Sequence, residues 1–154
     1  MRFWDTSPWY GRGLSEHRVG RFLYDRPRSE VVLSTKVGRV LKRARPVPHD
    51  GVELECHFPN QAPCHAKGAV MQGGLRQDHH HDYSYDGIMR SYEDSITRMG
   101  VPSIDLLVIH DCDLMHFKHP DQAHAMMAVL YTSGIRALEE LKRAGDIRGY
   151  GAGG

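Results

Sequence analysis

The apolar residues of this chain gather in four short runs that predict β-strands. The run "EVVLSTK" is rich in β-branched residues and does not alternate with polar ones, which is typical of a strand covered on both faces of a sheet. The run "IDLLVIH" indicates the most deeply buried strand of the four. Together with "RFWDT" and "IRGYG", these runs predict strands over residues 2–6, 30–36, 104–110 and 147–151.

Segments with helical spacing of their apolar residues lie between these strands. Ser15 is the expected N-cap of a helix over residues 15–25. A second helix is predicted over residues 85–100, where Gly100 ends it, and a third over residues 134–145. The apolar stripe of the second helix consists of Ile88, Met89, Tyr92, Ile96 and Met99.

Strands that alternate with helices predict an α/β fold with a parallel sheet and right-handed crossovers. About four βα units are present, which fits either a small doubly wound sheet or one arc of a (β/α)8 barrel. In both architectures the chemistry gathers at the carboxyl ends of the strands.

The segment from about residue 39 to residue 82 differs from the rest of the chain. It is rich in Pro, Gly, His and Gln and has weak periodicity, so we expect a loop insertion within a single domain over residues 1–154. Its Cys-His pairs and the run "DHHHD" raise the alternative of a zinc site. Structural zinc sites favour C-x₂₋₄-C and H-x₃₋₅-H spacings, which this segment lacks, so we expect no metal.

The composition limits the classes of partner. With 154 residues, 40% of them apolar and 25% charged, the chain is typical of one soluble globular domain. A net charge of +1 gives no strong field toward nucleic acid or membranes, so we expect neither as a partner. No apolar run reaches the ~20 residues that span a bilayer, no secretory signal follows Met1, and three cysteines argue against a disulfide framework. We expect a cytoplasmic protein.

Four chemically distinct side chains fall at the carboxyl ends of the predicted strands. Asp5 ends the first strand and Tyr10 lies in the following loop, while Lys36 and His110 end the next two strands. A buried lysine needs a partner, which Asp5 provides, and a lysine cation beside a phenol favours its ionised form. Tyr10 is thus a candidate general acid or base, and His110 a candidate for orienting a substrate carbonyl.

Each of these residues taken singly has an ordinary structural interpretation. A lysine after a strand is commonly a solvated rim residue, a loop tyrosine commonly packs, and a histidine after "LLVI" commonly bonds to the backbone. Their joint placement at consecutive strand ends favours a catalytic set.

Ordered motifs make the chain resemble the aldo-keto reductase superfamily. The motifs are "DTSPWYG", "GLSEHRVGRFL", "LSTKVGR", "YSYDGIMRSYEDSITRMG", "IDLLVIHD" and "GIRALEELKRAGDIRGYGAG". The chain is most similar to the branch of pyridoxal 4-dehydrogenases, L-fucose dehydrogenases and D-threo-aldose 1-dehydrogenases. The similarity spans nearly all of it outside residues 39–82 and 114–133.

The resemblance implies a (β/α)8 barrel and hydride transfer between NADP or NAD and a small aldose or an aldehyde. By motif match, Tyr10 is the proton donor or acceptor, Lys36 and Asp5 tune it, and His110 orients the substrate. The resemblance also implies that Asp5 and Thr6 contact the cofactor.

The length of the chain departs from this family. A (β/α)8 barrel needs about 250 residues, and the resemblance implies that this chain begins at the second barrel strand and stops in the fifth. We therefore expect a partial barrel that is inactive alone and whose exposed sheet edges favour self-association. The alternative is a non-catalytic half-barrel remnant or interaction module.

The final residues "GYGAGG" match the dinucleotide-binding pattern G-x-G-x-x-G. That motif requires a following helix and an acidic residue about 20 positions further on, and the given sequence contains neither. We interpret these residues as a strand rich in small side chains.

Overall fold

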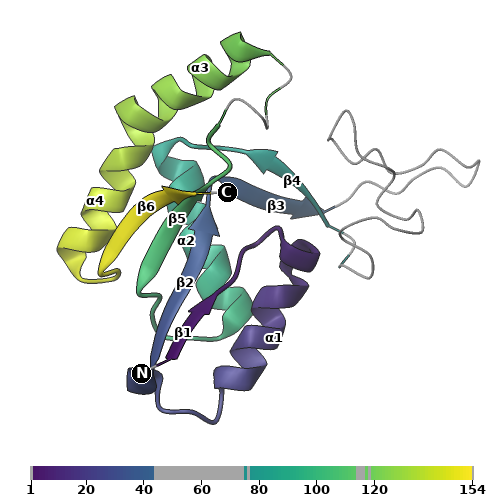
Figure 1. Cartoon of the computed structure of the whole chain (residues 1–154), viewed down its shortest axis with the longest axis vertical. Coiled ribbons are helices and arrows are strands. Elements are labelled where there is room, and N and C mark those ends of the chain that lie inside the picture. Colours follow the sequence, from purple (N-terminus) through teal and green to yellow (C-terminus); the bar gives the residue numbers. More distant parts are fainter. Residues whose placement is uncertain (1, 44–74, 76, 114–116, 118, 154) are drawn as a thin grey trace, which may run out of the picture.

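The chain is described by a computed structural model over residues 2–43, 75, 77–113, 117 and 119–153. Four parallel strands form one sheet in the order β1-β2-β5-β6, and a two-stranded antiparallel ribbon of β3 and β4 leaves its upper edge (Figure 1). The elements are β1 (Arg2–Asp5), η1 (Tyr10–Gly13), α1 (Leu14–Leu23), η2 (Arg28–Glu30), β2 (Val31–Val37), β3 (Arg39–Arg43), β4 (Gln77–His81), α2 (Tyr85–Met99), β5 (Leu106–His110), α3 (Pro120–Val129), the π-helical turn η3 (Leu130–Gly134), α4 (Ile135–Ala144) and β6 (Gly149–Gly153).

The four strands that the apolar runs predict are all present, as are the three helices. The sheet is parallel throughout, which confirms the prediction from alternating elements. The residues "GYGAG" form strand β6, which pairs with β5, so the glycine-rich end is a strand as expected.

The prediction of a loop over residues 39–82 is wrong at both ends of that segment. Arg39–Arg43 and Gln77–His81 pair as β3 and β4, in antiparallel register from Arg39 opposite His81 to Arg43 opposite Gln77. The strand sequences "RVLKR" and "QDHHH" have no clear alternation of apolar and polar residues, so the hydrophobic pattern of the chain did not predict them. Residues 44–74 of the predicted insertion, which include Cys56 and Cys64, lie outside the described residues.

The predicted N-cap Ser15 is also wrong. Helix α1 begins one residue earlier, at Leu14, and Gly13 occupies the N-cap position with a φ of 96°. The Ser15 hydroxyl lies 2.9 Å from the hydroxyl of Thr6 instead, which ties the start of α1 to the end of β1. A serine hydroxyl can bond either to a nearby backbone amide, as in an N-cap, or to another side chain. Here the Ser15 hydroxyl bonds to the side chain of Thr6 and does not cap the helix.

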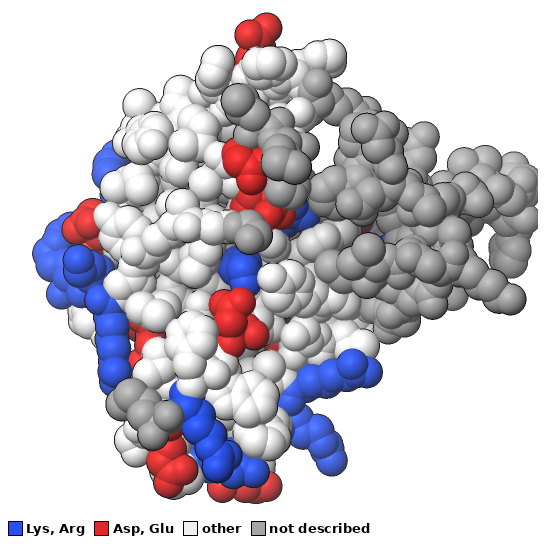
Figure 2. All heavy atoms as spheres, viewed as in Figure 1, with Lys and Arg blue, Asp and Glu red and all other residues white. Residues whose placement is uncertain are grey.

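The hydrophobic core lies between the sheet and the helices that cover one of its faces. Leu33 and Leu107 from the two central strands pack with Ile88 of α2 and Leu138 of α4, and all four are fully buried. Helix α2 lies behind β2 and β5, with α1 and α4 to either side (Figure 1). Basic and acidic side chains are interspersed over the molecular face in Figure 2. Among the described helices, none is both long and apolar enough to cross a membrane.

A buried glutamate of α1 connects this helix to the sheet and to α2. Glu16 of α1 is fully buried and accepts hydrogen bonds from Thr35 of β2 at 2.7 Å and from Arg98 of α2 at 2.5 Å. The same two helices approach closely at Gly20, where an added Cβ would lie 2.0 Å from the carbonyl oxygen of Met99. Only a residue without a side chain fits this crossing.

We expect Gly20→Ala to destabilise the fold by about 2–3 kcal/mol, because the new methyl group meets backbone that cannot rotate away. Urea denaturation followed by circular dichroism measures this change. Gly151→Ala is the matched control, since a Cβ there meets nothing within 4 Å. Equal stability of the two variants would contradict the close packing of α1 against α2.

A buried carboxylate joins three elements at the amino-terminal end of the sheet. Asp105 accepts hydrogen bonds from the Leu33 amide at 2.8 Å and from Arg28, and its second oxygen lies 2.9 Å from Arg148 Nε. Burial alone would raise the pKa of Asp105, but the Leu33 amide and the Arg28 guanidinium outweigh it, and the pKa is lowered from 3.8. The ionised form therefore stabilises the folded chain.

Asp105→Asn should lower the free energy of unfolding at pH 7 by about 2–3 kcal/mol, because it removes charge-assisted hydrogen bonds. The native pKa of Asp105 is depressed, so its contribution is present above the unfolded pKa of 3.8 and is lost as pH falls through the native value. Urea titrations from pH 7 to pH 3 should show the difference between wild type and variant shrinking. A difference independent of pH would contradict this assignment.

Candidate active site

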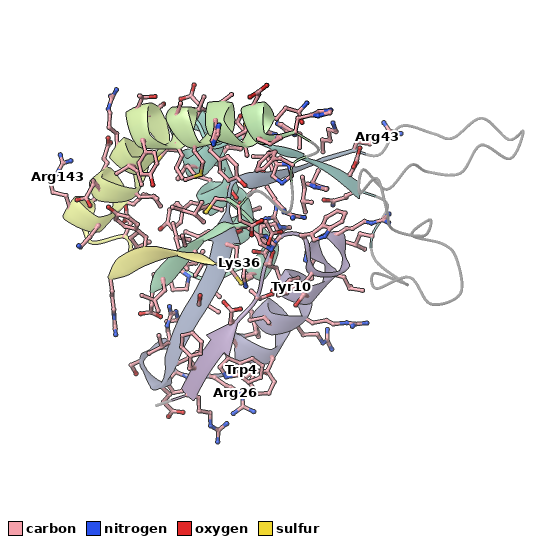
Figure 3. The ribbon with its side chains drawn as sticks, turned by 45° about the horizontal axis from the view of Figure 1, so that its top comes forward. Trp4, Tyr10, Arg26, Lys36, Arg43 and Arg143 are labelled. Atoms are coloured by element: carbon pink, nitrogen blue, oxygen red, sulfur yellow. The ribbon has the colours of Figure 1, made fainter. Side chains whose placement is uncertain are left out.

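The four predicted site residues meet at the carboxyl edge of the sheet. Asp5 ends β1, Lys36 lies next to the last residue of β2, and His110 ends β5. The parallel register places Asp5 opposite Ser34 and Lys36 opposite Val108, so these strands finish at similar heights. Lys36 and Tyr10 lie near one another above the ends of β1 and β2 (Figure 3).

Lys36 is a nearly buried cation with two hydrogen-bond acceptors. Its side chain is 7% exposed, and Nζ donates to Asp5 Oδ2 at 2.6 Å and to the carbonyl oxygen of Thr6 at 3.1 Å. The predicted pairing of Asp5 with Lys36 is therefore present. The carboxylate of Asp5 remains 38% exposed, so it offsets the buried charge and still faces the open edge of the site.

Tyr10 is brought over Lys36 by a tight turn after β1. The Tyr10 amide donates to the Ser7 carbonyl at 3.2 Å, and Pro8 occupies the middle of that turn. Gly11 has a φ of 61° and Gly13 a φ of 96°, conformations that only glycine adopts without strain. These two glycines let the chain reverse directly after Tyr10 and enter α1.

The phenol ring lies between the cation and the imidazole. Lys36 Nζ is 4.7 Å from the centroid of the Tyr10 ring. The ring of His110 contacts Tyr10 edge to face, with 6.0 Å between their centroids. The structure thus brings all four predicted site residues together.

The His110 imidazole has polar neighbours at both ring nitrogens. Nδ1 lies 3.1 Å from Ser7 Oγ, and Nε2 lies 3.3 Å from Asp111 Oδ2. The His110 carbonyl accepts a 2.7 Å hydrogen bond from the hydroxyl of Tyr83. Burial raises the pKa of the Tyr83 phenol above its ordinary value, so it remains a proton donor in this bond.

Asp111 lies in an unusual backbone conformation that returns its carboxylate to the site. Its φ is 49°, in the left-handed region that residues other than glycine seldom adopt. The Asp111 amide donates to the carbonyl of Gly153, its carbonyl accepts from Tyr83, and its carboxylate pairs with the buried guanidinium of Arg39. Burial lowers the pKa of Arg39 to about 10, which leaves it charged at neutral pH.

Sequence reasoning missed four residues that surround the predicted set. Asp111 follows His110 directly, but nothing in the pattern shows that it turns back toward the imidazole. Arg39 lies within the segment interpreted as a loop, and neither Ser7 nor Tyr83 carries a local signal. All four depend on contacts between segments distant in the chain.

The two residues expected to contact a cofactor differ in their accessibility. Asp5 presents a partly exposed carboxylate at the strand end. The Thr6 side chain is fully buried, with its hydroxyl toward Ser15, while its carbonyl faces Lys36. Asp5 thus fits a group that binds above the sheet, and the contact expected for the Thr6 hydroxyl stays a prediction.

The run "DHHHD" contributes to strand β4, where the His79 ring packs 4.1 Å from that of Trp9, centroid to centroid. Within the described ranges no three or more His, Cys, Asp or Glu residues are placed to hold a metal ion. The Cys56-His57 and Cys64-His65 pairs lie outside those ranges.

The sequence profile of the aldo/keto reductase family matches residues 1–154. The chain belongs to the aldo/keto reductase family. Pyridoxal 4-dehydrogenase of Microbacterium luteolum is 39% identical to this aldo/keto reductase chain over 153 residues, and D-threo-aldose 1-dehydrogenase of a Pseudomonas species is 34% identical over 156 residues. Each alignment covers 99% of the chain, which spans 42% and 40% of the length of the two relatives.

Solved structures of the aldo/keto reductase family share this fold. An aldo-keto reductase from Bacillus halodurans matches with a TM-score of 0.57 at 27% identity, and it is covered over 35% of its length. A glycerol dehydrogenase from Gluconobacter oxydans matches with a TM-score of 0.58 at 25% identity, covered over 33%. In each case 97% of the present chain aligns. The four-stranded sheet is therefore part of a (β/α)8 barrel, and the alternative of a small doubly wound sheet is wrong.

Proposed function

We propose that this chain carries the proton-transfer half of an oxidoreductase site, which moves hydride between NADP or NAD and a small aldose or aldehyde. The single observation that carries this proposal is the convergence of Asp5, Lys36, Tyr10 and His110 at one edge of the sheet. The matched relatives support the substrate class, because their names are those of dehydrogenases of pyridoxal and of an aldose.

The geometry supports a separate task for each side chain in carbonyl reduction. Tyr10 would deliver its hydroxyl proton to the carbonyl oxygen as that oxygen gains negative charge. Lys36, 4.7 Å from the ring centroid, would stabilise the phenolate that remains. Asp5 holds the ammonium in place through its 2.6 Å ion pair.

His110 would act on the same oxygen as a hydrogen-bond donor. Its ring contacts Tyr10 edge to face, so a carbonyl oxygen within reach of the phenol hydroxyl also approaches the imidazole. Two donors directed at one developing charge stabilise the transition state more than the bound substrate. In the direction of oxidation the same groups act in reverse.

A bound nicotinamide would supply or accept the hydride. Of the residues present, the Asp5 carboxylate fits a contact to it, since it stays partly exposed beside Lys36. The chain spans about two fifths of its curated relatives, so the remaining contacts to such a group would come from segments that match no part of this chain.

In a protein completed to the length of its relatives, replacing Tyr10 by Phe should lower kcat by about 10²–10⁴, because the proton donor is lost while the ring still packs on Lys36 and His110. Turnover of pyridoxal and of aldoses with NADPH, NADH and their oxidised forms is followed at 340 nm. Tyr24→Phe is the matched control, since Tyr24 is 85% exposed and lies outside the site. Unchanged kcat for the Tyr10 variant of an active protein would overturn the role of Tyr10.

The second candidate is a non-catalytic module that keeps the partial barrel fold without using a cofactor. The observation in its favour is the length, since the chain spans 42% of its relative from Microbacterium luteolum. Titration of the purified chain with NADPH and NADH, followed by nicotinamide fluorescence, separates the two. Saturable binding that Tyr10→Phe leaves intact would argue against the non-catalytic module, and absence of binding would favour it.

A further inference from the structure

We propose that Ser7 is a positioning residue that fixes the ring tautomer of His110, so that the imidazole carries its proton on Nε2. The catalytic consequence of this tautomer rests on the proposed oxidoreductase function. The tautomer itself follows from the contacts around the ring and can be measured without any activity.

Ser7 is placed against His110 by the same turn that positions Tyr10. Its side chain is fully buried, and Oγ lies 3.1 Å from Nδ1 of the imidazole. The Trp9 amide donates to this oxygen at 3.1 Å, which holds the Ser7 side chain in one orientation. The hydrogen bond from the Trp9 amide therefore orients the Ser7 hydroxyl independently of its contact with His110.

The direction of the hydrogen bond follows from burial. Ser7 Oγ already accepts a hydrogen bond from the Trp9 amide. Its own hydroxyl proton needs an acceptor within the protein, because the side chain is fully buried. An unprotonated Nδ1 at 3.1 Å provides that acceptor. A protonated Nδ1 would leave the Ser7 proton directed at another donor, at a cost of about 1–3 kcal/mol.

The opposite side of the ring favours the same tautomer. Asp111 Oδ2 lies 3.3 Å from Nε2, and Asp111 is held as a carboxylate by its ion pair with Arg39. A carboxylate at this distance accepts a hydrogen bond from a protonated Nε2 and has no proton to donate to an unprotonated one. Ser7 donates a hydrogen bond to Nδ1, and Asp111 accepts one from Nε2. These two contacts select the neutral imidazole that is protonated on Nε2.

This tautomer has a direct consequence for the proposed reaction. With substrate bound, the Nε2 proton would donate to the substrate oxygen together with, or in place of, the Asp111 carboxylate 3.3 Å away, whereas the alternative tautomer would offer a lone pair to that oxygen. Other charged or titratable groups facing the imidazole are the Tyr10 ring, the Tyr83 hydroxyl on its backbone carbonyl, and the Arg39–Asp111 pair. Ser7 would act through His110 and would not touch the substrate.

Nuclear magnetic resonance of the 154-residue chain, labelled with nitrogen-15, tests the tautomer directly. Long-range correlations from the ring protons give the shifts of Nδ1 and Nε2, and the signal absent from His110→Gln assigns them among the 11 histidines. We expect an unprotonated Nδ1 and a protonated Nε2 at neutral pH. A protonated Nδ1 in the wild-type chain, alone or together with Nε2, would overturn the proposal.

Variants then test whether Ser7 is the cause. Ser7→Ala should move the two nitrogen shifts toward each other as both tautomers become populated, and Ser7→Thr, which keeps the hydroxyl, should restore them. Ser91→Ala is the matched control, because Ser91 is also a buried serine but belongs to α2. Unchanged shifts in a folded Ser7→Ala chain would contradict the role of Ser7.

Kinetics give the second readout. Ser7→Ala should lower kcat by about 3- to 10-fold with little change in KM, since the lost donor acts on charge that develops in the transition state. Wild-type activity with unaltered kcat in the variant would overturn the catalytic consequence. Absence of turnover in a wild-type protein completed to the length of its relatives would count against the proposed function alone, because the ring-nitrogen spectrum of the 154-residue chain would still decide the tautomer.

Discussion

The buried ammonium of Lys36 is the constraint on which the site depends. A cation with 7% exposure is costly unless charge and hydrogen bonds compensate it, and Lys36 donates to Asp5 and to the Thr6 carbonyl. Both belong to the end of β1, so β1 must pair with β2 in the observed register for the charge to be tolerated. The turn that follows then has little freedom, and it carries Tyr10 over the same ammonium.

The two ends of the sheet use buried charge in different ways. At the amino-terminal end, Asp105 is surrounded by Arg28, Arg148 and a backbone amide, so its charge is compensated from several elements that it holds together. At the carboxyl end, the charge of Lys36 is shared between a partly exposed carboxylate and the ring of Tyr10. The first arrangement stabilises the fold, and the second places Tyr10 and a partly exposed carboxylate at the carboxyl edge of the sheet. This division is the one expected of barrel enzymes.

The β3–β4 ribbon contributes a residue, Arg39, to the surroundings of the candidate site. It leaves the sheet directly after β2, carries Arg39 to the carboxylate of Asp111, and is followed by Tyr83, whose hydroxyl binds the His110 and Asp111 carbonyls. Gly38 makes this possible, because its φ is 93° and an added Cβ would lie 2.2 Å from the Tyr83 ring. The ribbon and the strand β5 together hold the His110–Asp111 segment in its strained conformation.

The sequence by itself determined the four parallel strands, the helices α1, α2 and α4, and the candidate site residues. Apolar periodicity and glycine stops are local properties, and the rule that chemistry lies at the carboxyl ends of parallel strands selected Asp5, Tyr10, Lys36 and His110 without coordinates. Only the tertiary structure decided what surrounds His110. The contact of Ser7 with its Nδ1 joins residues 103 positions apart, and no local pattern records such a contact because its geometry depends on how the strands pair.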